Sequence, residues 1–328
     1  MHGELELVRW VRQRVTHDPA RVMLGVGDDM AAVRVDGAAV LVTSDMLLDE
    51  VHFDTRVHAM PLIGRKAMAC GLSDCAAMAV RPVCATISAA LPAGLAVSSV
   101  QALLDGAIRA GQAFGCELVG GDTNSWPHPL AIDVTVLAVE HEGIRAVRRD
   151  GARPGDVICV TGLLGGSLRG KHLTFTPRVS EARHLAATLG DQLHAMMDIS
   201  DGLSLDLFRM CEASGVGAVL DESLLARVVS PEAFAMSAAD GVAPIEHAMS
   251  DGEDYELVLA VGPDAAQRWL GRAGDPTGQQ PAPSGATTVG PVVLMPVGTI
   301  VSDAYTVRTL DGSLQPLTPR GYEHQFGA

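Results

Sequence analysis

Aspartates set among small residues are the feature of this sequence that could do chemistry. Six short segments carry aspartate beside Gly, Ser or Thr and contain no Lys or Arg: GVGDD (25–29), TSD (43–45), LSD (72–74), GGDT (120–123), MDISDG (197–202) and SDGED (250–254). Clustered carboxylates repel one another, and hard cations such as Mg²⁺ relieve that repulsion. Glycine and hydroxyl residues let backbone N–H groups approach phosphate oxygens. The set therefore predicts metal-bound phosphate chemistry.

Ordinary turn chemistry is the alternative interpretation of each segment taken singly, because Asp beside Gly or Ser is common in turns. We expect the six segments at the ends of helices and strands, and their number favours a shared site. Asp198 and Asp201 stand at an expected strand-to-helix junction. A helix N-terminus there offers free N–H groups to a phosphate, and the Asp pair can hold a cation. A simple helix cap by Ser200 or Asp201 is the other possibility.

Other chemistries fit the sequence less well. Residues 165–171 match the G-x-x-x-x-G-K pattern of a P-loop, but His172 stands where that loop needs Ser or Thr for Mg²⁺. Thr174, Thr176 and Pro177 also argue against the sustained helix that a P-loop requires. The cysteines and histidines lack zinc-ligand spacing, and a G-x-S-x-G nucleophile elbow is absent.

Composition narrows the class of protein. A chain of 328 residues suits two domains, and 48% hydrophobic with only 4% aromatic residues predicts a core of small aliphatic side chains. The net charge of −15 disfavours binding to nucleic acid or to an anionic membrane. The charged N-terminus predicts an amphipathic helix instead of a signal peptide, and the six cysteines form no C-x-x-C pair. We expect a cytoplasmic protein.

Helices and strands are expected to alternate through the chain. Alternating apolar runs predict strands at 38–43, 83–91, 132–139, 157–161, 196–199 and 255–261, and helical patterns lie at 62–79, 98–113, 180–189 and 203–213. The charged stretch 140–155 interrupts this rhythm, so we predict an N-terminal domain at 1–145 and a C-terminal domain at 146–328. A segment rich in Gly, Pro and Gln at 271–285 predicts a loop.

The ordered motifs resemble the thiamine-monophosphate kinase family nearly from end to end. They are GVGDDMAAV, TSDMLLDEVHFD, KAMACGLSDCAAMAVRP, GGDT, RDGARPGDVICVTGLLG, MMDISDGLSLDL, SDGEDYEL and RGYEHQF. That family belongs to a superfamily with aminoimidazole ribonucleotide synthetase, selenophosphate synthetase and a hydrogenase-maturation protein. The resemblance implies an α/β fold with mixed, α+β-like sheets in a two-domain aminoimidazole ribonucleotide synthetase-like architecture. It also implies a homodimer joined through the N-terminal domain.

The resemblance further implies a site and a reaction. Several Mg²⁺ ions would be held by Asp29, Thr43, Ser44, Asp45, Asp74, Asp122, Asp198 and Asp201, with Asp45, Asp74 and Asp122 as the catalytic residues. ATP would contact Gly121, Asp122, Arg149 and Ser200. Thiamine monophosphate would lie beside His52, Glu253 and Tyr322, whose aromatic ring offers a face to the cationic substrate. The implied reaction is direct in-line transfer of the γ-phosphoryl group of ATP, which gives thiamine diphosphate.

The sequence departs from the family pattern at three places. Asp251 replaces the first Gly of GGED, Gly71 stands where Asn is usual, and the segment after Gly166 is shortened where the family inserts a helix. Two alternatives follow: another ATP-using enzyme of the superfamily, or a non-catalytic relative that binds thiamine phosphates or nucleotide. The first cysteine is Cys70 and the chain ends Phe326-Gly-Ala, which disfavours selenophosphate synthetase and the hydrogenase-maturation protein.

Overall fold

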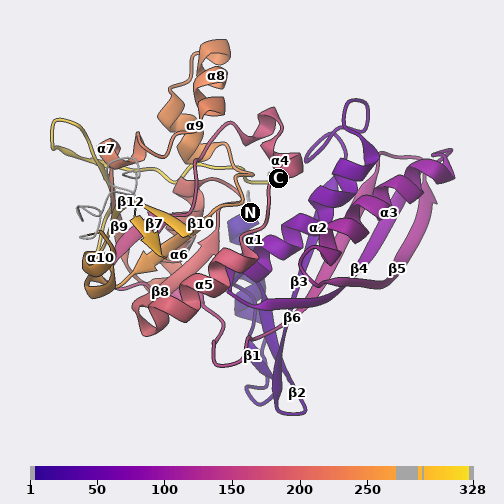
Figure 1. Ribbon diagram of the computed structural model, residues 1–328, viewed down its shortest axis with the longest axis horizontal. Coiled ribbons are helices and arrows are strands. Elements are labelled where there is room, and N and C mark those ends of the chain that lie inside the picture. Colours follow the sequence, from indigo (N-terminus) through magenta and orange to yellow (C-terminus); the bar gives the residue numbers. More distant parts are fainter. Residues whose placement is uncertain (1–3, 271–286, 290–291, 325–328) are drawn as a thin grey trace, which may run out of the picture.

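Two β-sheets with flanking helices form the protein (Figure 1). The computed structural model describes residues 4–270, 287–289 and 292–324. The first sheet has the order β1-β2-β3-β6-β4-β5, and its neighbouring strands are antiparallel except for the parallel pair β4 and β5. Its strands are β1 (Val22–Leu24), β2 (Ala31–Val35), β3 (Ala38–Leu48), β4 (Arg81–Pro92), β5 (Glu117–Trp126) and β6 (Ala131–Val139).

The second sheet has the order β14-β13-β9-β12-β7-β10-β8, with β11 paired to β12. Its strands are β7 (Val157–Val160), β8 (Leu193–Asp198), β9 (Gly217–Asp221), β10 (Leu257–Val261), β11 (Thr287–Val289), β12 (Val292–Val301), β13 (Tyr305–Arg308) and β14 (Leu314–Pro316). Strands β9 and β13 are parallel, whereas the other pairs are antiparallel. Both sheets are therefore mixed, and the predicted α/β class with mixed sheets is confirmed.

Helices separate the two sheets and cover their faces (Figure 1). They are α1 (Glu4–Arg14), α2 (Met60–Ala77), α3 (Val97–Gln112), α4 (Lys171–Thr174), α5 (Val179–Leu189), α6 (Leu203–Ser214), α7 (Glu222–Leu225), α8 (Pro231–Asp240), α9 (Pro244–Ser250) and α10 (Pro263–Leu270). The predicted elements recur with ends shifted by a few residues, and the N-terminal helix is confirmed. No helix among the described residues combines the length and apolarity needed to cross a bilayer.

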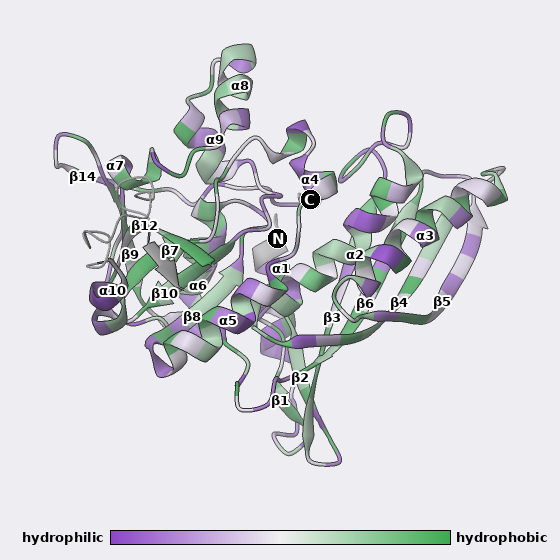
Figure 2. Cartoon of the chain, in the orientation of Figure 1, coloured by the Kyte–Doolittle hydropathy of each residue, from purple (hydrophilic) through white to green (hydrophobic). Residues whose placement is uncertain are grey.

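Helix α2 is buried between the two sheets. It packs on α3, β3 and β6 of the first sheet and on α4, α5 and β8 of the second. Nearly every side chain from Ile63 to Ala77 is buried, including the charged Lys66. A helix that carries apolar side chains on every face must be covered on every face. The hydropathy colouring shows α2 largely white and green in the middle of the molecule (Figure 2).

Three of the six aspartate segments lie inside elements, so the expectation that they stand at element ends is wrong there. The TSD segment lies within β3, because β3 continues to Leu48 in an unbroken ladder with β6. The LSD segment lies within α2. The GGDT segment lies within β5, a strand missed from the sequence because its polar, Gly-containing residues are exposed on a sheet edge. The predicted loop at 271–285 falls outside the described residues.

Close contact between α2 and α3 depends on two glycines. A Cβ on Gly64 would lie 1.8 Å from the carbonyl oxygen of Leu103, and one on Gly106 would lie 2.1 Å from that of Pro61. Both clashes are with backbone, which cannot rotate away. The two helices can therefore pack at this distance only with glycine at both positions.

We predict that Gly106→Ala destabilises the protein, because α2 and α3 must move apart to admit the methyl group. The expected loss is about 1 to 3 kcal/mol of unfolding free energy, the usual range for overpacking a core. Urea unfolding followed by circular dichroism measures it. Gln101→Ala, on the exposed face of the same helix, is the control and should change stability little. Equal midpoints for the two variants would contradict this account of the packing.

Candidate active site

A cavity of about 620 Å³ opens where the two sheets meet. Residues of β3, α2 and the loop before β2 form one wall, and the segments that follow β8 and α9 form the other. The sequence-predicted residues that line it are Asp29, Thr43, Ser44, Asp45, His52, Asp74, Arg149, Ser200, Asp201, Glu253 and Tyr322. The fold thus brings together side chains that are up to 293 positions apart (29 to 322) in the chain.

An acidic cluster lies at one end of this cavity. Asp29, Asp74 and Asp198 each place one carboxylate oxygen within 4.8 Å of the others. The Thr43 hydroxyl donates a hydrogen bond to Asp74, and the Ser73 hydroxyl donates to Asp198 at 2.5 Å. The Oδ2 atom of Asp29 is buried and has no hydrogen-bond partner in the described structure. An orphaned buried carboxylate oxygen beside two further carboxylates is a site that fits a cation.

Burial and mutual repulsion make the ionised cluster unfavourable without a cation. Burial is the largest cause that raises the pKa of Asp74 and of Asp198 well above the usual range, and neighbouring aspartates raise both further. The pKa of Asp45 is raised to about 6 by burial and then by the charges of Asp133, Asp201 and Asp29. Oxygen ligands of this kind suit Mg²⁺, which would restore the ionised state of these groups.

Two arginines partly neutralise the rim of the cluster. Arg149 pairs with Asp29 and lies 3.5 Å from Asp28, which reaches it from the same Gly-Asp-Asp segment. Arg209 bridges Asp201 and the fully buried Asp206. Asp206 in turn accepts hydrogen bonds from the backbone N–H groups of Asp201 and Gly202, and so fixes the turn that begins α6.

Aromatic and charged side chains gather at the other end of the cavity. The rings of His52 and Tyr322 have centroids 6.3 Å apart, and His324 lies 5.7 Å from His52 and 5.0 Å from Tyr322. Glu253 faces the same space from the loop that precedes β10. Its backbone N–H donates to the Ser200 carbonyl at 2.6 Å. This end offers flat rings and one carboxylate, which suit a cationic heterocycle.

Gly121 and Asp122 do not line the cavity of their own chain. They lie on the exposed edge strand β5, which is three strands away from β3 in the sheet order. At a strand spacing of about 4.8 Å, β5 is roughly 14 Å from β3. Asp198 is also absent from the lining, but it is buried directly behind it, within the acidic cluster.

Further polar residues of the site were given no role from the sequence, among them Lys66, Asp133, Asp206, Arg209 and His324. Two of them carried a usable signal. Lys66 stands in a mostly apolar helical stretch, and Asp133 is the one charged residue of the alternating strand 131–139. A charge within a buried element needs a partner, so such positions point to a polar site.

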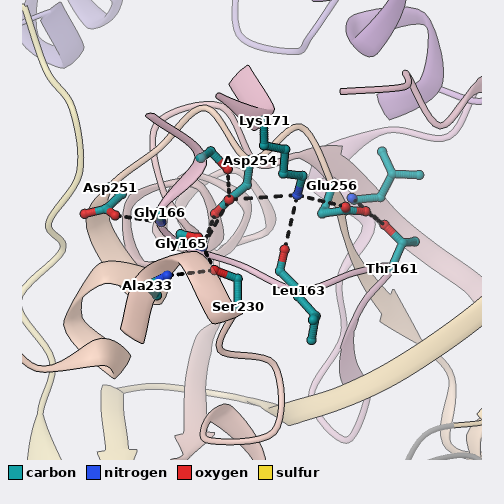
Figure 3. A network of polar contacts seen from close by, with 12 residues as sticks. Thr161, Leu163, Gly165, Gly166, Lys171, Ser230, Ala233, Asp251, Asp254 and Glu256 are labelled. Atoms are coloured by element: carbon teal, nitrogen blue, oxygen red, sulfur yellow. Dashed lines mark hydrogen bonds and ion pairs between the residues drawn. The ribbon is translucent and has the colours of Figure 1, made fainter. Parts of the chain in front are cut away.

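The structure excludes the P-loop interpretation of residues 165–171 (Figure 3). Lys171 Nζ lies 3.1 Å from Glu256 Oε1 and donates to the Leu163 carbonyl at 3.2 Å. The loop N–H of Gly165 is bound to the Asp254 carboxylate at 2.9 Å. Both groups that would hold a phosphate are therefore engaged by carboxylates, and α4 ends after four residues at Thr174.

Comparison with known proteins identifies the family. The sequence matches "AIR synthase related protein, N-terminal domain" over residues 27–139 and "AIR synthase related protein, C-terminal domain" over residues 153–279. The thiamine-monophosphate kinase of Rhodopirellula baltica is 38% identical over 272 residues, which cover 80% of this chain and 83% of that protein. The thiamine-monophosphate kinase of Mycobacterium tuberculosis is 35% identical over 293 residues, covering 83% and 85%.

Solved structures agree with the sequence matches. The structure described as "AaThiL complexed with AMPPCP and TMP" superimposes with a TM-score of 0.79 at 28% identity and covers 98% of this chain and 97% of that one. The thiamine monophosphate kinase of Aquifex aeolicus gives a TM-score of 0.71 at 27% identity, covering 95% and 97%. A HypE-HypF complex, at 20% identity and a TM-score of 0.70 over 95% and 99%, shares the fold.

Asp251, the departure from the family's GGED pattern, has a defined place in this site. One of its carboxylate oxygens accepts a hydrogen bond from the Gly166 N–H at 2.8 Å, and the other lies 2.8 Å from His247 Nδ1. The opposite ring nitrogen of His247 lies 3.3 Å from Asp240. The Asp251 carboxylate therefore joins the loop after Gly165 to helix α9. It does so through the His247 imidazole, which lies between the carboxylates of Asp251 and Asp240.

We predict that this imidazole makes stability depend on pH. Burial lowers the pKa of His247, but the hydrogen bond and charge of Asp251, and then those of Asp240, raise it overall. A raised folded-state pKa stabilises the fold fully below the unfolded value of about 6.5, and this contribution is lost as pH rises through the folded pKa. The stability gap between wild type and His247→Gln should be larger at about pH 6 than at about pH 8.5.

Urea unfolding at both pH values measures the gap. His184→Gln, at a half-exposed position on α5, controls for the loss of a histidine as such. A gap for His247→Gln that is equal at both pH values would refute the role of the imidazolium.

Proposed function

We propose that this chain, which belongs to the AIR synthase related family and within it to the thiamine-monophosphate kinases, transfers the γ-phosphoryl group of ATP to thiamine monophosphate. Its two-domain α/β architecture is that of the family. The observation that carries the proposal is the cavity between the sheets, with carboxylates gathered at one end and aromatic rings at the other. One end suits metal-bound phosphates and the other suits a cationic heterocycle, so a single cavity accommodates both substrates.

The carboxylate and hydroxyl oxygens of the cavity fit Mg²⁺ as the cofactor. We assign its ligands to Asp29, Thr43, Ser44, Asp45, Asp74, Asp198 and Asp201, together with Asp122. Support comes from the buried, unpartnered oxygen of Asp29 and from the raised pKa values of Asp45, Asp74 and Asp198. When bound, Mg²⁺ neutralises the charge of two phosphates that must meet in line.

The side chains of the protein position the two substrates. Arg149 is held against Asp28 and Asp29 and lines the cavity, so its guanidinium charge lies beside the place where a phosphate would bind. Ser200 lines the cavity at the turn that precedes α6. We assign both residues, with Gly121 and Asp122, to ATP. No general base is needed, because the phosphate of thiamine monophosphate is already ionised at neutral pH.

The acceptor end is assigned to His52, Glu253 and Tyr322. Tyr322 is 44% exposed, and its ring can offer a face to a cationic ring. Leu168, from the shortened segment after Gly166, also lines the cavity. We infer that this segment contributes to the shape of the acceptor site although it forms only a short 3-10 turn and the four-residue helix α4.

The expected activity is formation of thiamine diphosphate from ATP and thiamine monophosphate in the presence of Mg²⁺. Asp45→Asn should lower kcat by roughly 100-fold or more, because a ligand that orients a catalytic ion is lost. Chromatographic detection of thiamine diphosphate measures both. Asp191→Asn, at an exposed turn outside the cavity, is the matched control and should leave turnover unchanged. Absence of product with concentrated wild-type enzyme would refute the function, and normal turnover of Asp45→Asn would refute the ligand assignment.

A homodimer joined through the N-terminal domain completes the proposed site. Among the residues that the structure describes, no strand pairs with the outer side of β5, the edge of its sheet, so the backbone groups on that side lack strand partners. Its residues Val119 and Trp126 are 63% and 38% exposed. We propose that two chains associate through β5, whose residues are exposed on both faces, and that this association brings Gly121 and Asp122 of one subunit to the cavity of the other.

This proposal predicts complementation between two defective subunits. In a heterodimer of Asp45→Asn and Asp122→Asn chains, one of the two cavities would receive an intact Asp45 and an intact Asp122 from different subunits. Mixed, refolded subunits should therefore recover a substantial part of the activity that each variant lacks alone. If Asp122 served its own chain, both cavities would be defective and mixing would restore nothing. Light scattering on the same samples tests the dimer itself.

A further inference from the structure

Lys66 is a fully buried lysine that the function described so far does not use. Its side chain is 0% exposed. The ammonium group donates to the His52 carbonyl oxygen at 2.5 Å and to Glu253 Oε2, and it lies 3.1 Å from His172 Nδ1. A buried ammonium is unfavourable unless it is paired and hydrogen-bonded. Two of these partners belong to the residues assigned to the acceptor.

Glu253 is held from one side only. Its Oε2 atom receives Lys66 and lies 3.1 Å from His172 Nδ1, whereas no hydrogen bond to Oε1 is found within the described part of the chain. Burial alone would raise the pKa of Glu253, but His172 and Lys66 lower it overall. Glu253 is therefore an ionised carboxylate at neutral pH, and it has one oxygen left to accept a hydrogen bond in the cavity.

The backbone at Glu253 needs such an anchor. Glu253 and Tyr255 have φ angles of 55° and 50°, in the left-handed region that side chains other than glycine rarely adopt. Conformations of this kind persist only where surrounding contacts hold them. The backbone of this loop is fixed by hydrogen bonds to Ser200 and Ile199. Lys66 and His172 add the contacts that fix the Glu253 side chain.

Helix α2 connects Lys66 rigidly to the acidic cluster. Lys66, Cys70 and Asp74 stand four residues apart along one face of the helix. Eight residues of helix span about 12 Å. The same rigid element thus presents a cation at the acceptor end of the cavity and a carboxylate at the metal end, and it keeps a constant distance between them.

We propose that Lys66 is a positioning residue that fixes His52 and Glu253 at the acceptor end, so that thiamine monophosphate is aligned with the phosphate held at the acidic cluster. The inference rests on the proposed function and adds a residue to it. Lys66 acts through its two partners and does not itself touch the acceptor, because it is completely covered by them and by α2. The competing explanation is that Lys66 only balances the buried charge of Glu253.

Lys66→Met tests the proposal, with Arg65→Met as the matched control. Arg65 is the neighbouring cation on α2, and it joins the helix to the carbonyls of Leu173 and Phe175 without lining the cavity. For Lys66→Met we expect kcat/KM for thiamine monophosphate to fall by about 10- to 100-fold, because a small displacement of a positioning group has effects of this size. The KM for ATP should stay within about twofold. Arg65→Met should show no such selective loss.

Two further variants guard against misfolding. Lys66→Arg keeps the charge and should show a smaller loss that is again confined to the acceptor. The double variant Lys66→Met, Glu253→Gln should be no worse than Glu253→Gln alone, because residues that act as a unit are not additive. Calorimetric binding of thiamine monophosphate without ATP should weaken in Lys66→Met and not in Arg65→Met.

Several outcomes would overturn the proposal. These are equal changes for ATP and acceptor, equal effects of Lys66→Met and Arg65→Met, or effects of Lys66 and Glu253 that multiply in the double variant. Failure of the proposed function is separate and would appear as lack of turnover in the wild type. Acceptor-selective loss in an active wild-type background supports Lys66 as the positioning residue.

Discussion

The need to cover helix α2 on all sides governs the architecture. Its side chains are buried almost without interruption from Ile63 to Ala77, and neither sheet alone could enclose them. The first sheet and α3 cover one side, and α4, α5 and β8 of the second sheet cover the other. Glycines at positions 64 and 106 let α3 approach α2 closely enough to exclude water from that side of the helix. The cavity lies at this junction because polar groups on α2 meet polar groups from both sheets there.

Charge is divided between the two ends of the cavity. At the acidic cluster, carboxylates outnumber the two arginines that reach them, so their charge is only partly neutralised by the protein. At the acceptor end, Lys66, Glu253 and His172 form a compact cluster in which the charges of Lys66 and Glu253 balance. A phosphoryl transfer between two anions requires this arrangement, since charge must be neutralised at the reacting phosphates while the remainder of the acceptor is held by shape and hydrogen bonds.

The segments around Gly166 and Asp251 depart from the family pattern, and new hydrogen bonds within the fold hold them in place. The shortened segment after Gly166 is tied down by carboxylates of Asp251 and Asp254, and Lys171 is occupied by Glu256 (Figure 3). A sequence that resembles a phosphate-binding loop is therefore an internally bonded turn. The site keeps its acidic cluster because that cluster is built from the loop before β2, from α2 and from the end of β8, which the shortened segment does not interrupt.

The sequence by itself determined the chemistry, the mixed α/β class and most of the side chains that meet in the cavity. Aspartates among small residues can be recognised in the sequence as a phosphate and metal site, because carboxylate repulsion and backbone access to phosphate depend on residue type alone. Tertiary structure decided what depends on neighbours distant in the chain. Lys66 is paired only because the fold places Glu253, 187 residues away, against its buried ammonium group. Asp122 was separated from the cluster because β5 lies at the far edge of its sheet, and strand order is set by long-range pairing that residue type does not specify.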